Sequence, residues 1–131
     1  MKIRLADYVS QFLVDNGITH GFTVTGGGAM HLNDALGHQA GLTMVYNHHE
    51  QACAIAAESY ARINNKIAVL CVTTGPGGTN ALTGVVGGWL DSFLCLLYRD
   101  RYVTIQRQEA QALIYVRWEI RNSISPEQLL Q

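Results

Sequence analysis

The feature that most constrains this chain is the apolar run from Ile67 to Val72, which is followed at once by a loop of threonines and glycines. A run of strand length without polar alternation is typical of a strand that is buried on both faces. Shorter β-type runs at residues 21–24 and 42–46 also end in loops rich in Gly, Thr, Asn or His. The chain therefore favours a parallel sheet that helices cover on both sides.

Helical patterns lie between these runs. Leu5, Val9, Phe12 and Leu13 recur at helical spacing, and Asn16-Gly17 gives a natural stop. Further helices are predicted over 29–36, from about 50 to 64, and over 79–90. Because helices and strands alternate, residues 1–92 are predicted to form an α/β domain with an open parallel sheet and helices on both faces.

Composition limits the functional classes. The 131 residues suffice for one domain, and a net charge of −1 gives no electrostatic reason to expect nucleic acid or an anionic membrane as a partner. No apolar run has the length of a membrane span. The three cysteines are odd in number and lack metal or redox spacing. We expect reduced thiols and a cytoplasmic location.

The loops after the strands should meet at one edge of the sheet, where helix N-termini and bare amides bind ligands. Gly26, Gly27 and Gly28 follow the first strand and either turn the chain or let a ligand approach the backbone. The sequence contains neither G-x-G-x-x-G nor G-x-x-x-x-G-K-[ST], which disfavours a dinucleotide or ATP site.

The third loop runs from Gly75 to Asn80 and combines proline with glycines. Such a loop forms a rigid, bare wall that suits a flat ring. The alternative is a tight strand-to-helix connection in which Thr79 or Asn80 caps the helix.

His48-His49-Glu50 stands at the start of the third helix. His49 and Cys53 are four residues apart, but no third ligand has suitable spacing, so no metal site is predicted. Glu50 is either a carboxylate favoured by the helix dipole or a partly desolvated acid. In the second case its pKa would be raised, and it could share a proton with a ring nitrogen.

Taken together, the loops resemble the pyrimidine-binding domain of acetolactate synthase-like enzymes, which use thiamine diphosphate. The motifs that carry the resemblance are Val24-Thr25-Gly26-Gly27-Gly28-Ala29-Met30, His49-Glu50-Gln51-Ala52, Ala56-Ala57-Glu58-Ser59-Tyr60-Ala61-Arg62, Thr74-Gly75-Pro76-Gly77-Gly78-Thr79-Asn80 and Trp89-Leu90-Asp91-Ser92. The family commonly has Pro at the positions of Thr25 and His31, which leaves the substrate open between that of acetolactate synthase and that of a relative from a surface-polysaccharide cluster.

The resemblance implies a role for each loop. Glu50 would contact N1′ of the aminopyrimidine and promote loss of the proton from C2 of the thiazolium. Gly26 to Gly28 would approach the thiazolium and the 2-oxoacid substrate. Thr74, Gly75, Pro76, Gly77 and Asn80 would wall the pyrimidine.

The resemblance also implies partners outside this sequence. Magnesium and the diphosphate would be held by a separate domain of a partner subunit, in a homodimer or tetramer, and some members of the family require FAD. The Gly-Asp-Gly diphosphate motif with its paired Asn does not occur in the 131 residues. We therefore expect this chain to be inactive alone. The alternative is a non-catalytic remnant with little or no binding.

The family pattern stops after Ser92. Residues 99–121 carry five arginines, at positions where the family continues with a buried strand. When the reading frame is shifted so that each codon begins at the third base of the preceding one, the codons for Phe93 to Thr104, with one flanking codon at each end, can spell I-P-V-F-I-I-S-G-Q-V-R-Y-D. Those for Val116 to Ile124 can spell S-M-G-D-Q-E-F-D-I, and both are family strings. We thus predict a partial domain at 1–92 and an aberrant, out-of-frame tail at 93–131; the alternative is a diverged tail. The lost continuation should leave the sheet one strand short.

Overall fold

The computed structural model describes residues 3–90, 95–99 and 114–116. These residues form one sheet in the strand order β2-β1-β3-β4-β5. The strands are β1 (His20–Thr23), β2 (Thr43–Tyr46), β3 (Ala68–Val72), β4 (Cys95–Arg99) and β5 (Ile114–Val116). The first four pair in parallel, and β5 pairs antiparallel to β4. The predicted α/β class is confirmed.

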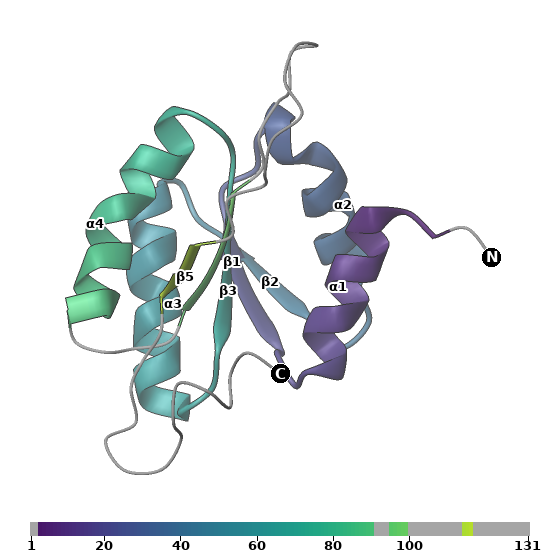
Figure 1. The fold of residues 1–131 in the computed structure, drawn as a ribbon, viewed down its shortest axis with the longest axis horizontal. Helices are drawn as coiled ribbons and strands as arrows, with labels where there is room; N and C mark the ends of the chain where they lie inside the picture. The colour runs from purple at the N-terminus through teal and green to yellow at the C-terminus, as the bar shows by residue number, and fades with distance from the viewer. Residues whose placement is uncertain (1–2, 91–94, 100–113, 117–131) are drawn as a thin grey trace.

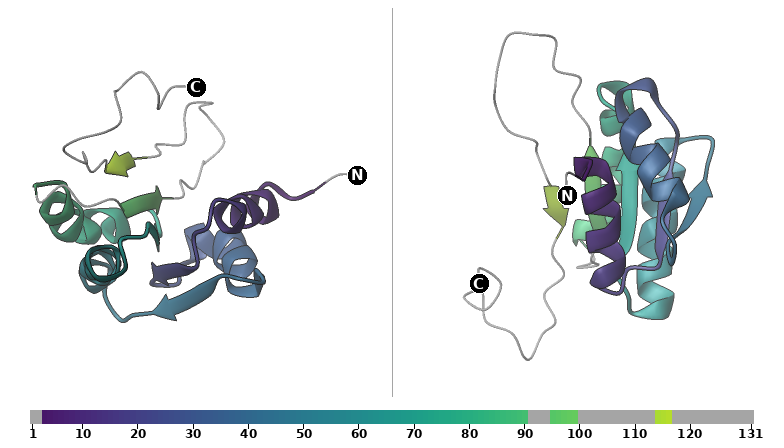
Figure 2. Two further views of the ribbon diagram at one scale, coloured as in Figure 1. Left: turned by 90° about the horizontal axis from the view of Figure 1, so that it is seen from below. Right: turned by 90° about the vertical axis from the view of Figure 1, so that its right-hand side faces the viewer.

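Helices cover both faces of the sheet, as predicted. Helices α1 (Leu5–Asp15) and α2 (Met30–His38) lie on one face, and a short 3₁₀ turn, η1 (Gly27–Ala29), leads into α2. Helices α3 (Glu50–Asn64) and α4 (Pro76–Leu90) lie side by side on the other face (Figure 1). Figure 2 shows the two helical layers with the sheet between them.

Strand β3 is the centre of the core, because all five of its residues are buried. Its side chains alternate between the two faces of the sheet. Leu70 and Val72 pack with Cys53, Ala57 and other small residues of α3 and α4. Val69 and Cys71 pack beneath α1 and α2 with residues such as Leu36. The unbroken apolar run in the sequence thus corresponds to a strand that is buried on both faces of the sheet.

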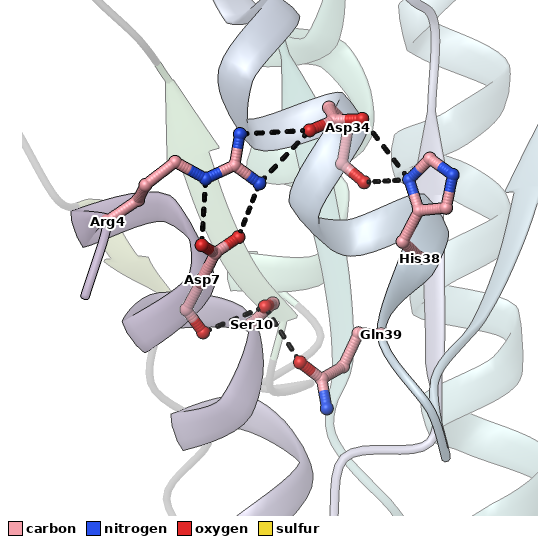
Figure 3. A network of polar contacts seen from close by, with 6 residues as sticks. All are labelled: Arg4, Asp7, Ser10, Asp34, His38 and Gln39. Atoms are coloured by element: carbon pink, nitrogen blue, oxygen red, sulfur yellow. Dashed lines mark hydrogen bonds and ion pairs between the residues drawn. The ribbon is translucent and has the colours of Figure 1, made fainter.

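Polar contacts join α1 to α2 at the surface of the first layer (Figure 3). Arg4 makes ion pairs with Asp7 at 2.7 Å and with Asp34 at 3.2 Å. The guanidinium of Arg4 lowers the pKa of the Asp7 carboxyl. The buried hydroxyl of Ser10 donates to Gln39 at 2.9 Å. These contacts link α1 to α2 at the surface, above the buried residues that the two helices share, such as Leu13 and Leu36.

Two helix boundaries differ from the sequence prediction. Helix α4 begins at Pro76 rather than at Thr79. Proline suits the first turn of a helix because its missing N–H would have no helical partner there. Thr79 and Asn80 therefore lie inside the helix and do not cap it. Helix α2 continues past Gly37 to His38, whereas α1 ends as predicted, with Gly17 at a φ of 77°.

The predicted loss of a strand after β3 is wrong. Strand β4 pairs along all of β3, from Ala68 opposite Cys95 to Val72 opposite Arg99. Strand pairing uses backbone groups, and the string Cys95-Leu96-Leu97-Tyr98 is apolar enough to enter a sheet whatever its origin. Within the predicted helix-or-strand segment 113–118, Ile114–Val116 is a strand. The expectations for 100–113 and 117–131 lie outside the described residues.

In the part of the chain that the structure describes, no helix has the length and apolar character needed to cross a membrane.

Candidate active site

The candidate site lies where β1, β2 and β3 end, at their carboxyl edge. The three strands run in parallel, with Thr23 opposite both Tyr46 and Cys71. Each is followed by a short loop that leads into η1, α3 or α4. Parallel pairing therefore brings together the three loops that the sequence singled out. In a parallel sheet all strands end at the same edge, and the helix that follows each strand begins there.

Glu50 is the first residue of α3, and its position depends on the residue before it. His49 is the N-cap of this helix, and its Nδ1 accepts a hydrogen bond from the backbone N–H of Gln51 at 3.1 Å. An acceptor at the N-cap satisfies one of the free amides of the first turn. His49 therefore acts here as a helix cap. The Cys53 thiol is buried and accepts a hydrogen bond from Asn47 Nδ2 at 3.4 Å.

The carboxylate of Glu50 meets an exposed residue of α4. The Asn80 amide Nδ2 donates to Glu50 Oε2 at 3.0 Å. This hydrogen bond lowers the pKa of Glu50 below its ordinary value, and the effect exceeds the opposing effect of burial. The predicted raised pKa is thus wrong for the chain by itself. Burial does act in the predicted direction, but a donated hydrogen bond stabilises the charged form more.

Close packing of α3 on α4 sets the distance between these two side chains. A Cβ on Gly84 would lie 2.5 Å from Ala54 Cβ and 3.0 Å from the backbone nitrogen of Ile55. Only glycine permits such an approach without displacement. Because Asn80 lies one helical turn before Gly84, the same packing carries Asn80 to Glu50.

The first and third loops touch through Thr73. A Cβ on Gly26 would lie 2.5 Å from Thr73 Cβ, and one on Gly28 would lie 3.0 Å from Thr73 Oγ1. A Cβ on Gly77 would lie 2.9 Å from Thr73 Cγ2 and 3.3 Å from Glu50 Oε1. Thr73 therefore packs against both glycine loops, and Glu50 lies beside Gly77 of the third loop.

The other predicted residues lie along the same edge. Thr74 is half-buried, and its Oγ1 would be 3.3 Å from a Cβ on Gly28. Gly75 has a φ of 66°, which favours glycine, and nothing lies within 4 Å of its Cβ position. Nothing lies within that distance of Gly27 either, and Pro76 is exposed.

Thr73 joins the loops but was not among the residues predicted from the sequence. The signal was its place between a buried strand and a glycine loop, because that position must face neighbouring loops. Asn80 was expected to line a ring, whereas its amide bonds to Glu50. Nothing in the sequence indicates that Asn80 is the partner of Glu50, because this contact depends on how α4 packs on α3.

These residues fit an aminopyrimidine. A flat heteroaromatic ring needs open backbone beside its faces and one carboxyl group for a ring nitrogen. Gly27 and Gly75, which have nothing within 4 Å of their Cβ positions, supply the first, and Glu50 supplies the second. Among residues 3–90, 95–99 and 114–116, no group of three or more His, Cys, Asp or Glu side chains could hold a metal ion.

The fold is that of a doubly wound α/β domain, and the predicted site residues lie where its strands end. The profile of the family described as "Thiamine pyrophosphate enzyme, N-terminal TPP binding domain" matches residues 3–111. The chain belongs to this family of thiamine pyrophosphate (thiamine diphosphate) enzymes.

Similar proteins include acetolactate synthases. The large subunit from Buchnera aphidicola subsp. Schizaphis graminum is 38% identical over 83% of this chain and 18% of that protein. The isozyme 3 large subunit from Escherichia coli is 38% identical over 76% of this chain and 17% of that protein. The chloroplastic enzyme from Arabidopsis thaliana is 36% identical over 66% of this chain and 13% of that protein. The chain thus spans less than a fifth of these curated relatives.

Proposed function

We propose that this domain is the cofactor-activating part of a thiamine-diphosphate enzyme of the acetolactate synthase type, which decarboxylates and joins 2-oxoacids. The observation that carries the proposal is the Glu50 carboxylate, which lies against bare backbone at Gly77 and is anchored by Asn80. Membership of the thiamine pyrophosphate enzyme family supports it.

The role proposed for Glu50 is proton exchange. When bound, thiamine diphosphate supplies an acidic C2–H beside a ring cation, and its aminopyrimidine supplies a nitrogen that can take up that proton. Glu50 would hold or release a proton at N1′, and so control the basicity of the amino group that is conjugated to N1′ across the ring. Gly26 to Gly28 would leave room for the thiazolium and substrate, and Thr74 to Gly77 would orient the pyrimidine.

The remaining parts of the proposal concern the complete enzyme. Magnesium and the diphosphate would be bound by another domain, and the enzyme would be a homodimer or tetramer in the cytoplasm. FAD would be required only if this chain follows those relatives that bind it. Branched-chain amino acid biosynthesis is the corresponding pathway.

We propose further that residues 1–92 are a partial domain and that residues 93–131 are read out of frame. The shifted family strings support this division. The family match, which continues to residue 111, and the pairing of β4 with β3 favour the alternative of a diverged continuation. The nucleotide sequence distinguishes the two.

The proposed role of Glu50 is tested in an enzyme that joins this domain to the other domains of the family. Glu50→Gln should preserve folding and slow C2 proton exchange of the cofactor by at least about 100-fold, the scale of a general acid–base contribution. An amide cannot exchange a proton with N1′. Exchange is followed by NMR after transfer into deuterated water. Near-normal exchange in the variant would remove Glu50 from the mechanism.

A further inference from the structure

The hydrogen bond between Asn80 and Glu50 links the two helices that flank the site. Glu50 begins α3, and Asn80 lies in the second turn of α4. The 3.0 Å contact joins the amide nitrogen to one particular carboxylate oxygen, Oε2. The other oxygen, Oε1, lies beside Gly77, 3.3 Å from where a Cβ on that residue would be. The two oxygens therefore have different surroundings.

The chemistry of the amide assigns a different role to each oxygen. An amide nitrogen only donates hydrogen bonds, whereas an ionised carboxylate only accepts them. A proton on Oε2 would make that oxygen a poorer acceptor for the Asn80 amide and weaken the contact. A proton on Oε1 leaves the contact intact, so Oε1 is the favoured site of protonation.

The contact is held in place by the backbone rather than by flexible side chains alone. Close packing at Gly84 and Ala54 fixes α4 against α3. The His49 cap fixes the first turn of α3, from which Glu50 projects. With both helix starts fixed, the Asn80 hydrogen bond orients the carboxylate at the end of the Glu50 side chain.

We propose that Asn80 is a positioning residue, which holds Glu50 by Oε2 and directs the exchangeable proton to Oε1, on the side of Gly77. The role of Asn80 as an anchor for Glu50 is independent of the proposed function. Only the identity of the ring nitrogen that meets Oε1 rests on it. The lowered pKa of Glu50, caused first by the Asn80 amide, agrees with a donor that stabilises the carboxylate.

The test is the pKa of the Glu50 carboxyl, measured by NMR titration of the full chain. Asn80→Ala removes the donor, and Asn80→Asp keeps the shape but places a second carboxylate beside the first. The matched control is Asn64→Ala. Asn64 is also an asparagine, but it lies at the far end of α3, where its side chain donates to the Tyr60 carbonyl. Circular dichroism establishes that each variant is folded.

We expect the pKa of Glu50 to rise in Asn80→Ala, to rise further in Asn80→Asp, and to stay unchanged in Asn64→Ala. A like charge adds to the loss of the donor, which gives this order. An unchanged pKa in both Asn80 variants would overturn the proposal. The pKa of Glu50 could move as expected in the Asn80 variants while the Glu50→Gln enzyme keeps normal C2 proton exchange. In that case the proposed function fails, but the positioning of Glu50 by Asn80 is supported. The two failures are therefore distinguishable.

Discussion

At the scale of single residues, the site depends on how one carboxylate is stabilised. The Asn80 hydrogen bond lowers the pKa of Glu50 and burial raises it, and the hydrogen bond has the larger effect. The sequence indicates the effect of burial, because a helix start after an apolar strand is partly desolvated. It does not indicate the hydrogen bond, because residues 50 and 80 are brought together only by tertiary packing.

The lowered pKa predicts how stability depends on pH. The folded chain holds Glu50 ionised to a lower pH than its ordinary pKa of 4.5. Between the two values the unfolded state binds more protons, so stability falls as the pH falls. The stability that Glu50 contributes is present above about pH 5, and it is lost as the pH falls through the lower, folded-state pKa.

Urea denaturation of the chain and of Glu50→Gln at several pH values measures this effect. The difference in unfolding free energy should be constant near neutral pH and shrink in acid. In an Asn80→Ala background the same difference should depend less on pH, because the pair no longer interacts. A difference that grows as the pH falls would mean that the pKa of Glu50 is raised in the folded chain.

At the scale of elements, the order and the type of most helices and strands can be predicted from the sequence. The exact start of α4, the presence of β4 and the packing of one helix on another cannot. The run Ile67 to Val72 predicted a buried strand, and β3 is buried throughout. The sequence pattern places the start of α4 three residues too late, because the glycines around Pro76 are typical of a loop, whereas proline begins the helix. The strand β4 was missed because backbone pairing requires no family pattern.

The packing of α3 on α4 gives a prediction for Gly84. Replacing a helical glycine by alanine gains up to about 1 kcal/mol of helix propensity. At Gly84 the new Cβ would lie 2.5 Å from Ala54 Cβ, with backbone also within reach. Overpacking of this kind costs about 1–3 kcal/mol. We therefore expect Gly84→Ala to be destabilised in urea denaturation.

Gly87→Ala is the matched control on the same helix. Its Cβ would meet only Glu58 Oε2, at the ordinary distance of 3.8 Å. This variant should be as stable as the original chain or more stable, by up to about 1 kcal/mol. Equal effects of alanine at positions 84 and 87 would show that the close approach of α3 and α4 does not matter.

At the scale of the whole molecule, the first question concerns the origin of the chain beyond residue 92. We predict that the codons for residues 93–131, read in the shifted frame, spell the family's strand and its Ser-Gly-Gln. Sequencing of the gene and its downstream region tests this. If those codons do not spell the family strings, the tail is a diverged continuation, and β4 belongs to the domain in its own right.

A second question at this scale is how tightly the chain binds its cofactor. Glu50 and the bare walls would contact only the ring portion of thiamine diphosphate, whereas the diphosphate and magnesium are assigned to another domain. We expect the 131-residue chain to bind thiamine diphosphate no more tightly than about 1 mM, which corresponds to roughly −4 kcal/mol. Micromolar affinity in calorimetry would show that the chain supplies more of the site than these loops.

The central claim, that the carboxyl edge of the strands is an aminopyrimidine site, is tested most directly by NMR. Thiamine diphosphate at millimolar concentration is titrated into the isotope-labelled chain, and backbone amide shifts are recorded. We predict that the largest shifts occur at Gly26 to Gly28, at Glu50 and at Gly77. Absence of shifts there would contradict the claim, as would shifts centred on the opposite edge, where the His20 and Tyr60 rings lie 4.7 Å apart.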